Sequence, residues 1–290
     1  SIANIDKPRG PTSHQVSEYV QKIFGIDKAG HSGTLDPHVT GALPTALGRA
    51  TRITQFLLTA GKEYVGIMHL HKDVPEKEIR EAVAKFTGKL MQKVPLRSAV
   101  KRQVREREVY YAEILEIEGK DVLFRIGTQA GTYIRMWCHD LGKHLKVGAH
   151  MSELRRTKAG MFDETTLVTL QELQDYFVYC KEENNDKRLK EVLQPVELGV
   201  SHLPKVWLID SAVDAICHGT SLAVPGICKY NSGIKEKDTV ALMTLKDELV
   251  AVGDAAMNSE QIGKESKGIA VRPTAVFMQP GVYPKYKKAQ

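Results

Sequence analysis

The sequence predicts an α+β protein built in two parts. Over residues 1–203, amphipathic helical segments alternate with strand-like runs, and the runs at 109–117 and 122–126 predict a hairpin. From 204 onwards the strands become short and turns frequent, which is typical of a small β-rich module such as a partly closed barrel. We therefore expect a first domain over 1–203, a second over 204–283 and a basic tail over 284–290.

Caps and apolar spacing define the elements of the first part. Thr12 or Ser13 can cap a helix that ends at Gly25, and Thr169 with Glu172 forms a capping box for a helix running through 177. Apolar spacing adds helices at 47–60, 75–87 and 133–145 and strands at 2–5 and 64–71. We expect a loop over 147–160 and a surface insertion over 181–190.

The second part reads as short strands with one small helix. The helix is expected at 211–218, because Gly219 is a natural stop. The predicted strands lie at 205–209, 222–227, 240–245, 248–252, 269–271 and 275–278, and the third and fourth of these form a hairpin.

Composition favours an anionic partner and a reducing compartment. Lys and Arg exceed Asp and Glu by 41 − 35 = 6 and the pI is near 9.0, which is typical of proteins that bind nucleic acid. The 4 cysteines are widely spaced without a CxxC pair, so reduced thiols are expected rather than disulfides or a zinc site. With no apolar leader and no run of about 18 apolar residues, the prediction is a cytoplasmic protein without a membrane partner.

A loop over 29–44 places one carboxylate, Asp36, among three glycines and two prolines. Glycine permits positive φ and close approach of a ligand, and proline fixes φ, so this segment reads as a shaped loop. Taken alone, the pattern favours an aspartate that caps a turn, because Asp-Pro commonly starts turns. A catalytic carboxylate is the alternative.

The motifs typical of common cofactor and metal chemistry are absent from the sequence. The chain has no GxGxxG or Walker loop, no HExxH and no GxSxG, so neither a cofactor nor a metal is expected. What remains is the Asp36 loop, an aromatic residue at a strand start (Tyr64), an arginine at a helix start (Arg135) and a basic stretch over 89–107. That stretch fits either a solvated face or a phosphate-binding segment. Together these features favour a metal-free site that acts on RNA or DNA.

Five motifs in order resemble the TruB class of pseudouridine synthases. They are 6–13 (DKPRGPTS), 33–44 (GTLDPHVTGALP), 62–64 (KEY), 131–135 (GTYIR) and 154–157 (LRRT). The segments 95–102 and 148–151 resemble the dyskerin branch, the catalytic subunits of box H/ACA ribonucleoproteins, and 222–227, 237–241 and 267–270 are similar to its PUA domain. The resemblance implies a mainly antiparallel mixed sheet flanked by helices, followed by a small barrel-like PUA domain.

By this resemblance, the chain isomerises uridine to pseudouridine without a cofactor. Asp36 matches the essential carboxylate, Arg135 its guanidinium partner, and Tyr64 the aromatic residue that stacks on the target base. The remaining site residues are assigned to two groups. Expected substrate contacts are Lys7, His31, Thr34, Ile67 and Leu154, and expected RNA contacts are Arg97, Lys101, Arg102, Arg155, Arg156 and Lys267.

The dyskerin branch implies a set of partners. They are a box H/ACA guide RNA, an rRNA substrate, small proteins of the zinc-ribbon and Gly-Arg-rich types, and a kink-turn-binding ribosomal-type protein reached through the guide. An archaeal-type protein would be cytoplasmic, and a eukaryotic one nucleolar. Two alternatives stay open: a stand-alone tRNA T-loop synthase, and a non-catalytic RNA-binding assembly protein. The combination of Asp36, Tyr64 and Arg135 speaks against the second, because a pure binder needs no such trio.

Overall fold

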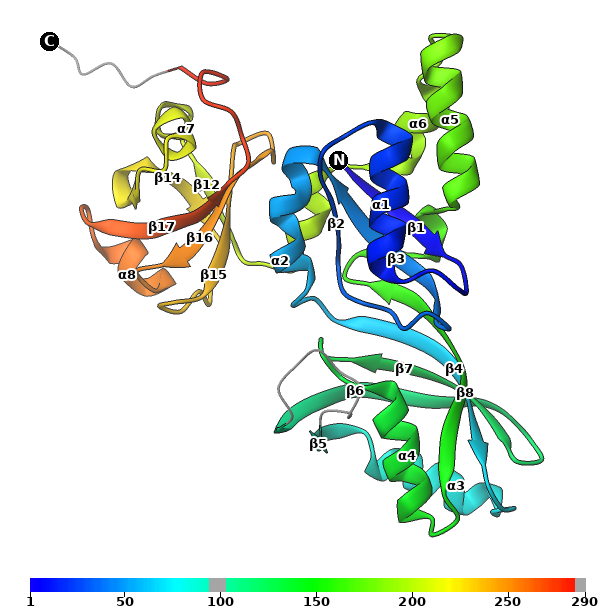
Figure 1. Cartoon of the computed structure of the whole chain (residues 1–290). Coiled ribbons are helices and arrows are strands. Elements are labelled where there is room, and N and C mark those ends of the chain that lie inside the picture. The colour runs from blue at the N-terminus through cyan, green and yellow to red at the C-terminus, as the bar shows by residue number, and fades with distance from the viewer. Residues whose placement is uncertain (94–102, 285–290) are drawn as a thin grey trace, which may run out of the picture. The chain divides into compact units, whose positions relative to one another are not determined.

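A computed structural model describes residues 1–93 and 103–284 of the chain. The chain divides into two compact units, Ser1–Gln194 and Pro195–Gln290, each with its own hydrophobic core (Figure 1). The expected RNA contacts Arg97, Lys101 and Arg102, and most of the expected tail, lie outside the described residues.

A mixed sheet organises the first unit. Its main path runs in the order β10-β1-β3-β8-β4-β7-β6-β5, and only the β1–β10 and β3–β8 pairs are parallel. The expected mainly antiparallel sheet is confirmed. The strands on the path are β1 (Ile2–Lys7), β3 (Thr40–Leu47), β4 (Lys62–Leu70), β5 (Gly88–Lys93), β6 (Val104–Glu118), β7 (Asp121–Thr128), β8 (Ala149–Ala159) and β10 (Leu167–Val168). Short strands β2 (Ala29–His31), β9 (Phe162–Asp163) and β11 (Leu193–Gln194) pair beside it.

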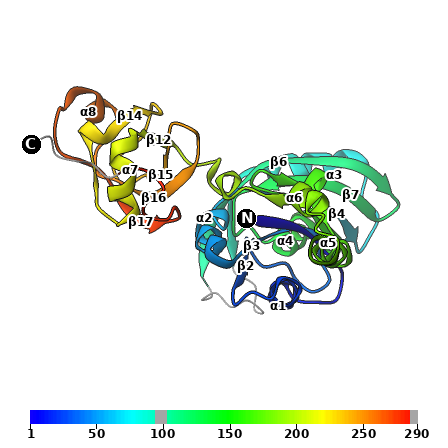
Figure 2. The ribbon, with the colours of Figure 1, turned by 90° about the horizontal axis from the view of Figure 1, so that it is seen from above.

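Helices pack against two regions of this sheet. Close to β1 and β3 lie α1 (Ser13–Phe24), α5 (Leu170–Glu182) and α6 (Lys187–Val192) (Figures 1 and 2). Beside the β4–β8 half lie α3 (Glu76–Lys85) and α4 (Ile134–His144), and the buried Trp137 of α4 packs on Phe124 of β7. The expected capping box of Thr169 is present, Thr12 rather than Ser13 caps α1, and Gly25 ends α1 with a positive φ of 61°.

The expected loop at 147–160 is wrong. This segment is β8, which lies between β3 and β4 near the centre of the sheet. Its pairing with β4 shifts register between Ile67 and Met68, so the strand carries a bulge near Ser152. The bulge breaks the period-two alternation of apolar residues that would have revealed the strand in the sequence.

Two other expectations for the first unit need correction. The helix expected at 47–60 is a 3₁₀ turn over Gly48–Ile53 followed by the short α2 (Thr54–Leu57). The expected insertion at 181–190 is instead the end of α5 and the start of α6, whose Leu189 packs into the core. Charged side chains dominate this stretch, and they hide its one buried leucine from a sequence pattern.

The second unit is a six-stranded sheet in the order β13-β17-β16-β15-β12-β14. Its elements are β12 (Lys205–Leu208), α7 (Asp210–Cys217), β13 (Leu222–Ala223), β14 (Ile227–Tyr230), β15 (Thr239–Met243), β16 (Leu249–Ala255), α8 (Ser259–Lys264) and β17 (Ile269–Val276). The strands expected at 269–271 and 275–278 are one strand, β17, whose register with β16 shifts beside Pro273. Helix α8 was not expected. Across 1–93 and 103–284, no helix is long and apolar enough to cross a membrane.

Candidate active site

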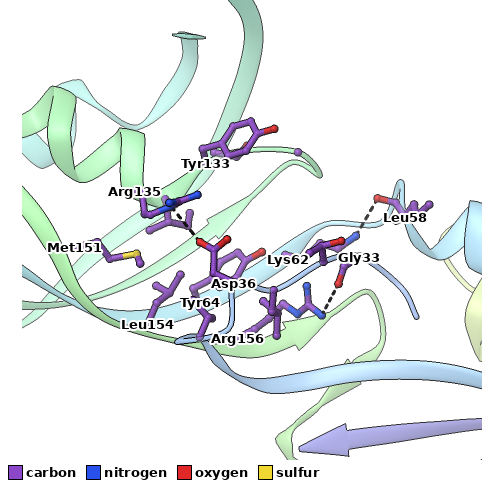
Figure 3. A pocket seen from close by; sticks show the side chains of 16 residues that line it. Gly33, Asp36, Leu58, Lys62, Tyr64, Tyr133, Arg135, Met151, Leu154 and Arg156 are labelled. Atoms are coloured by element: carbon purple, nitrogen blue, oxygen red, sulfur yellow. Dashed lines mark hydrogen bonds and ion pairs between the residues drawn. The ribbon is translucent and has the colours of Figure 1, made fainter. Parts of the chain in front are cut away.

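A pocket of about 480 Å³ opens in the first unit where four segments meet (Figure 3). The Asp36 loop forms one side, and the start of α4 forms the side opposite it. Strands β4 and β8 supply most of the remaining lining, including Tyr64 and Leu154, and Leu58 at the end of α2 adds to it. Asp36, Tyr64 and Arg135, which lie far apart in the sequence, therefore share one cavity.

Backbone contacts on both sides fix the shape of the Asp36 loop. The hydroxyl of Ser13 accepts a hydrogen bond from the amide of Leu35 at 2.8 Å, and the amide of Gly10 donates to the carbonyl of Pro37 at 2.9 Å. Gly41 has a φ of 99°, and a Cβ there would lie 2.2 Å from the carbonyl oxygen of Arg156. Glycine is thus required at this position both by backbone conformation and by close packing.

Asp36 forms an ion pair with Arg135 across the pocket. Oδ2 of Asp36 lies 3.1 Å from Nε of Arg135, and the side chains are 44 % and 42 % exposed. Arg135 comes from the first turn of α4, where a cation opposes the helix dipole and an acidic partner offsets that cost; the pairing expected from the resemblance is found. Gln92 of β5 holds the start of α4, because its side chain bonds both the amide and the carbonyl of Tyr133.

Two buried lysines donate hydrogen bonds to backbone carbonyls around the Asp36 loop and the pocket. Nζ of Lys7 donates to the carbonyls of Pro8, Pro37 and Val39 at 2.9–3.2 Å. Nζ of Lys62 donates to the carbonyls that end α2, at 2.6–3.0 Å. Burial lowers the pKa of Lys7, an effect that the Asp36 carboxylate opposes, and burial with the nearby Arg156 charge lowers the pKa of Lys62 to about 7.

Of the expected substrate contacts, Thr34 and Leu154 line the pocket and the other three do not. Lys7 is buried, and its Nζ contacts the carbonyls of Pro37 and Val39 rather than the pocket. His31 lies on β2, because the two ends of the expected 29–44 loop are the strands β2 and β3; its Nδ1 accepts a hydrogen bond from the amide of Gly33 at 3.3 Å, and burial lowers the pKa of the imidazole. Ile67 is three residues from Tyr64 on β4, so its side chain lies on the opposite face of the sheet. The expected contact of Ile67 with the pocket is therefore wrong.

The expected RNA contacts that the structure describes differ in how exposed they are and in what they pair with. Arg156 is 1 % exposed, so its expected contact with the RNA backbone is wrong: no surface remains for a phosphate. Its neighbour Arg155 bonds both Asp6, at 2.9 Å, and Glu164, at 2.6 Å, which raises the pKa of its guanidinium. Lys267 is exposed on the second unit.

Several residues that line the pocket were not among the expected site residues. Lys62 belongs to the motif that contains Tyr64, and that adjacency was the available signal. Met151 and Leu58 line the pocket, but nothing in the sequence separates them from ordinary apolar residues. Over the described ranges, no group of three or more His, Cys, Asp or Glu residues could hold a metal ion.

Comparison with known proteins shows which family the chain belongs to. The profile of the TruB family pseudouridylate synthase N-terminal domain matches residues 21–134. That of the tRNA pseudouridylate synthase B C-terminal domain matches 135–201, and that of the PUA domain matches 204–277. A Pyrococcus abyssi protein named "Probable tRNA pseudouridine synthase B" is 57% identical over 98% of this chain and 85% of its own length. This chain belongs to the TruB family.

Further relatives show how far the likeness extends. A protein of the same name from Methanopyrus kandleri is 54% identical over 98% of this chain and 84% of its own length. The crystal structure of a Cbf5-Nop10-Gar1 complex matches with a TM-score of 0.96 and 57% identity, covering 98% of this chain and 87% of that one. A structure of an H/ACA RNP bound to a substrate RNA containing 2′-deoxyuridine matches at 0.92 and 54%, with the same coverage. As a TruB-family member, the chain is an RNA pseudouridine synthase.

Proposed function

We propose that this chain converts specific uridines of rRNA to pseudouridine as the catalytic subunit of a guide-RNA-directed H/ACA ribonucleoprotein. The observation that carries the proposal is the Asp36–Arg135 ion pair, which lies in a pocket that Tyr64 and Leu154 also line. The reaction is an isomerisation. The N1–C1′ bond breaks, C5 bonds to C1′, C5 loses a proton and N1 gains one.

The pocket residues suit the steps of this reaction. Asp36 acts on the sugar through its carboxylate, which the guanidinium of Arg135 pairs with at 3.1 Å and holds in place. The Tyr64 ring offers a stacking surface for the extruded base, and Leu154 with Thr34 bounds the space beside it. Extrusion of a base costs a few kcal/mol, which stacking and phosphate contacts offset.

Guide direction rests on the structural relatives. The two H/ACA structures share 54–57% identity with this chain over 98% of its length, and both are assemblies rather than single proteins. We propose domain limits of 1–203 and 204–283, with the PUA domain, including Lys267, anchoring the guide RNA. The proposed partners are proteins of the Nop10 and Gar1 kinds, and the proposed location is the archaeal cytoplasm.

A second candidate is a stand-alone tRNA T-loop synthase. It is favoured by the names of the sequence relatives, which refer to tRNA. The chemistry at Asp36 would be the same, and only the targeting would differ.

One experiment separates the two candidates. The purified chain is incubated with rRNA fragments and with tRNA, each with and without an H/ACA guide and the two partner proteins, and pseudouridine is mapped at nucleotide resolution. The proposal predicts modification of the rRNA uridine that the guide selects, and that this modification depends on the guide. Modification of the tRNA T-loop alone, regardless of guide, would favour the second candidate, and no modification of either RNA would overturn both.

A further inference from the structure

Gln92 is a buried glutamine of β5 whose side-chain amide bonds the backbone of a single residue, Tyr133. It is 3 % exposed, whereas its neighbours Met91 and Lys93 are exposed. Its Oε1 accepts a hydrogen bond from the amide of Tyr133 at 3.0 Å, and its Nε2 donates to the carbonyl of Tyr133 at 3.2 Å. A buried side-chain amide is costly without partners, so the interior of the unit accommodates this glutamine through these two bonds.

The two bonds together specify the backbone conformation of Tyr133. Tyr133 directly precedes the first turn of α4, and its φ of −97° and ψ of 105° are extended. In an extended residue the N–H and the C=O point to the same side, so one partner can bond both, as in a hydrogen-bonded pair of antiparallel strands. In a helical residue they point in opposite directions along the axis. Gln92 can therefore form both bonds only while α4 begins after Tyr133.

The start of α4 in turn determines where Arg135 lies. The Tyr133 side chain does not cap the helix, and the Tyr133 carbonyl accepts from two amides of the first turn at 3.0–3.1 Å. Arg135 belongs to this turn, and its Nε lies 3.1 Å from Oδ2 of Asp36. Tyr133 and Arg135 both line the pocket (Figure 3). The peptide group that Gln92 holds is thus the one from which the first turn is built.

We propose that Gln92 is a positioning residue for the reaction, which fixes the start of α4 and thereby the place of Arg135 against Asp36. This rests on the proposed uridine isomerisation at the pocket. Gln92 is buried and is not among the residues that line the pocket, so its effect on the reaction passes through Arg135. Without the two bonds, Tyr133 is free to become helical, which rotates the first turn and moves the guanidinium away from the carboxylate.

The test compares Gln92→Met with a matched control in the assembled ribonucleoprotein with its guide RNA. Gln92→Met keeps the length of the side chain and removes both bonds. The control, Asn4→Leu, also removes a buried side-chain amide, but this one lies on β1 and donates to the carbonyl of Asp163 and the hydroxyl of Thr166 at 2.8–2.9 Å. Single-turnover rate at saturating RNA, the dissociation constant for substrate RNA and the denaturation midpoint are measured for each.

We expect Gln92→Met to slow turnover about tenfold while the dissociation constant stays within about twofold, because a misplaced catalytic partner affects the chemical step. When Gln92→Met is added to Arg135→Gln, the further loss should be less than about threefold, because both changes act on one ion pair. Asn4→Leu should lower the denaturation midpoint, since it leaves backbone partners without their donor, and keep the turnover rate within about twofold of wild type.

A second measurement follows Arg135 directly and needs no RNA. In the free chain labelled with ¹⁵N-arginine, the Nε–H resonance of Arg135 is assigned by its absence in Arg135→Gln. The ion pair with Asp36 protects this proton from exchange with water, and we expect Gln92→Met to speed its exchange about threefold or more, with no change in Asn4→Leu. Gln92→Asn, whose amide is too short to form both bonds, serves the same comparisons if Gln92→Met does not fold.

Four results would overturn the inference while leaving the proposed function intact. They are a wild-type turnover rate in the Gln92 variant, an effect confined to the dissociation constant, multiplied losses in combination with Arg135→Gln, or unchanged exchange at the Arg135 Nε–H. An inactive wild-type assembly would instead count against the proposed function, and the exchange measurement would still decide whether Gln92 positions Arg135.

Discussion

Nε of Arg135 lies 3.1 Å from Oδ2 of Asp36, so the first turn of α4 meets the loop between β2 and β3 at a single ion pair. Both side chains are less than half exposed, and a pair of this kind contributes little to folding stability. Its effect becomes larger when a bound RNA excludes water from the pocket, because charges interact more strongly at lower dielectric. The pair is thus suited to holding a reactive carboxylate rather than to stabilising the fold.

Replacing Asp36 by Asn should abolish isomerisation. The amide has nearly the same shape as the carboxylate but cannot act as an anion on the sugar, and a loss of about 1,000-fold or more is expected. Binding of guide and substrate RNA should stay within about twofold of wild type, because phosphate contacts dominate RNA affinity. The measurement is a single-turnover pseudouridine assay beside a filter-binding titration. Turnover close to wild type would remove Asp36 from the catalytic role.

Replacing Arg135 should lower the chemical rate more than RNA affinity. Arg135→Gln removes the charge that faces Asp36, and we expect about a 100-fold slower turnover at saturating RNA. Arg135→Lys keeps a charge but lacks the planar guanidinium, so its turnover rate should lie between those of the wild type and Arg135→Gln. The rate constant and the dissociation constant are measured separately. A change confined to the dissociation constant would assign Arg135 to RNA binding instead.

Sequence patterns predicted those structural features that depend on residues close together in the sequence. The helix cap at Thr12 or Ser13 and the capping box at Thr169 needed only neighbouring residues, and Thr12 and Thr169 are both caps in the structure. The pairing of Arg135 with Asp36 did not follow from local signals; it was expected from the ordered motifs. For the helix caps local signals sufficed, so those predictions held without knowledge of the tertiary structure.

What the sequence could not predict depends on contacts across the fold. Lys7 was expected to contact the substrate and Arg156 the RNA backbone, yet both are buried and donate to backbone carbonyls of segments distant in the sequence. Strand β8 was hidden because its bulge breaks the alternation that marks a strand. In both cases the deciding partner lies on another segment, so a linear pattern carries no trace of it.

Gly66 should be intolerant of any side chain. It lies on β4 two residues from Tyr64, and a Cβ there would come within 2.7 Å of Leu154 Cδ1 and 2.8 Å of the carbonyl of Glu153. Gly66→Ala should reduce the free energy of unfolding by roughly 1–3 kcal/mol, the cost of overpacking a core. Chemical denaturation measures it, and Leu154→Ala in the same background should recover part of the loss. An unchanged denaturation midpoint would mean that β4 and β8 can separate freely.

Lys62 should make stability depend on pH. Burial lowers its pKa from 10.5 to about 7, so between these values the unfolded chain binds a proton that the folded chain does not. The free energy of unfolding therefore rises with pH over this window, by at most about 1.4 kcal/mol per pH unit from this group. In Lys62→Met that contribution disappears and the curve flattens between pH 7 and 10. Chemical denaturation at several pH values in this range gives the slope of unfolding free energy against pH for the wild type and for Lys62→Met. Equal slopes would contradict the prediction.

The basic segment that contains Arg97, Lys101 and Arg102 provides a test of RNA contact that depends on charge alone. If these three side chains neutralise three phosphates, changing all three to Gln should reduce the slope of log affinity against log salt by about 2. The matched control is Lys187→Gln, Arg188→Gln and Lys190→Gln on α6, which removes the same charge from an exposed surface where Arg188 and Lys190 already pair with Glu191 and Asp186. Affinity for substrate RNA is titrated at several salt concentrations for both variants. Because counterion release counts contacts and not net charge, the control slope should stay at the wild-type value. Equal slopes in the two variants would assign the effect to the overall charge of the protein, and the segment would then be a solvated face.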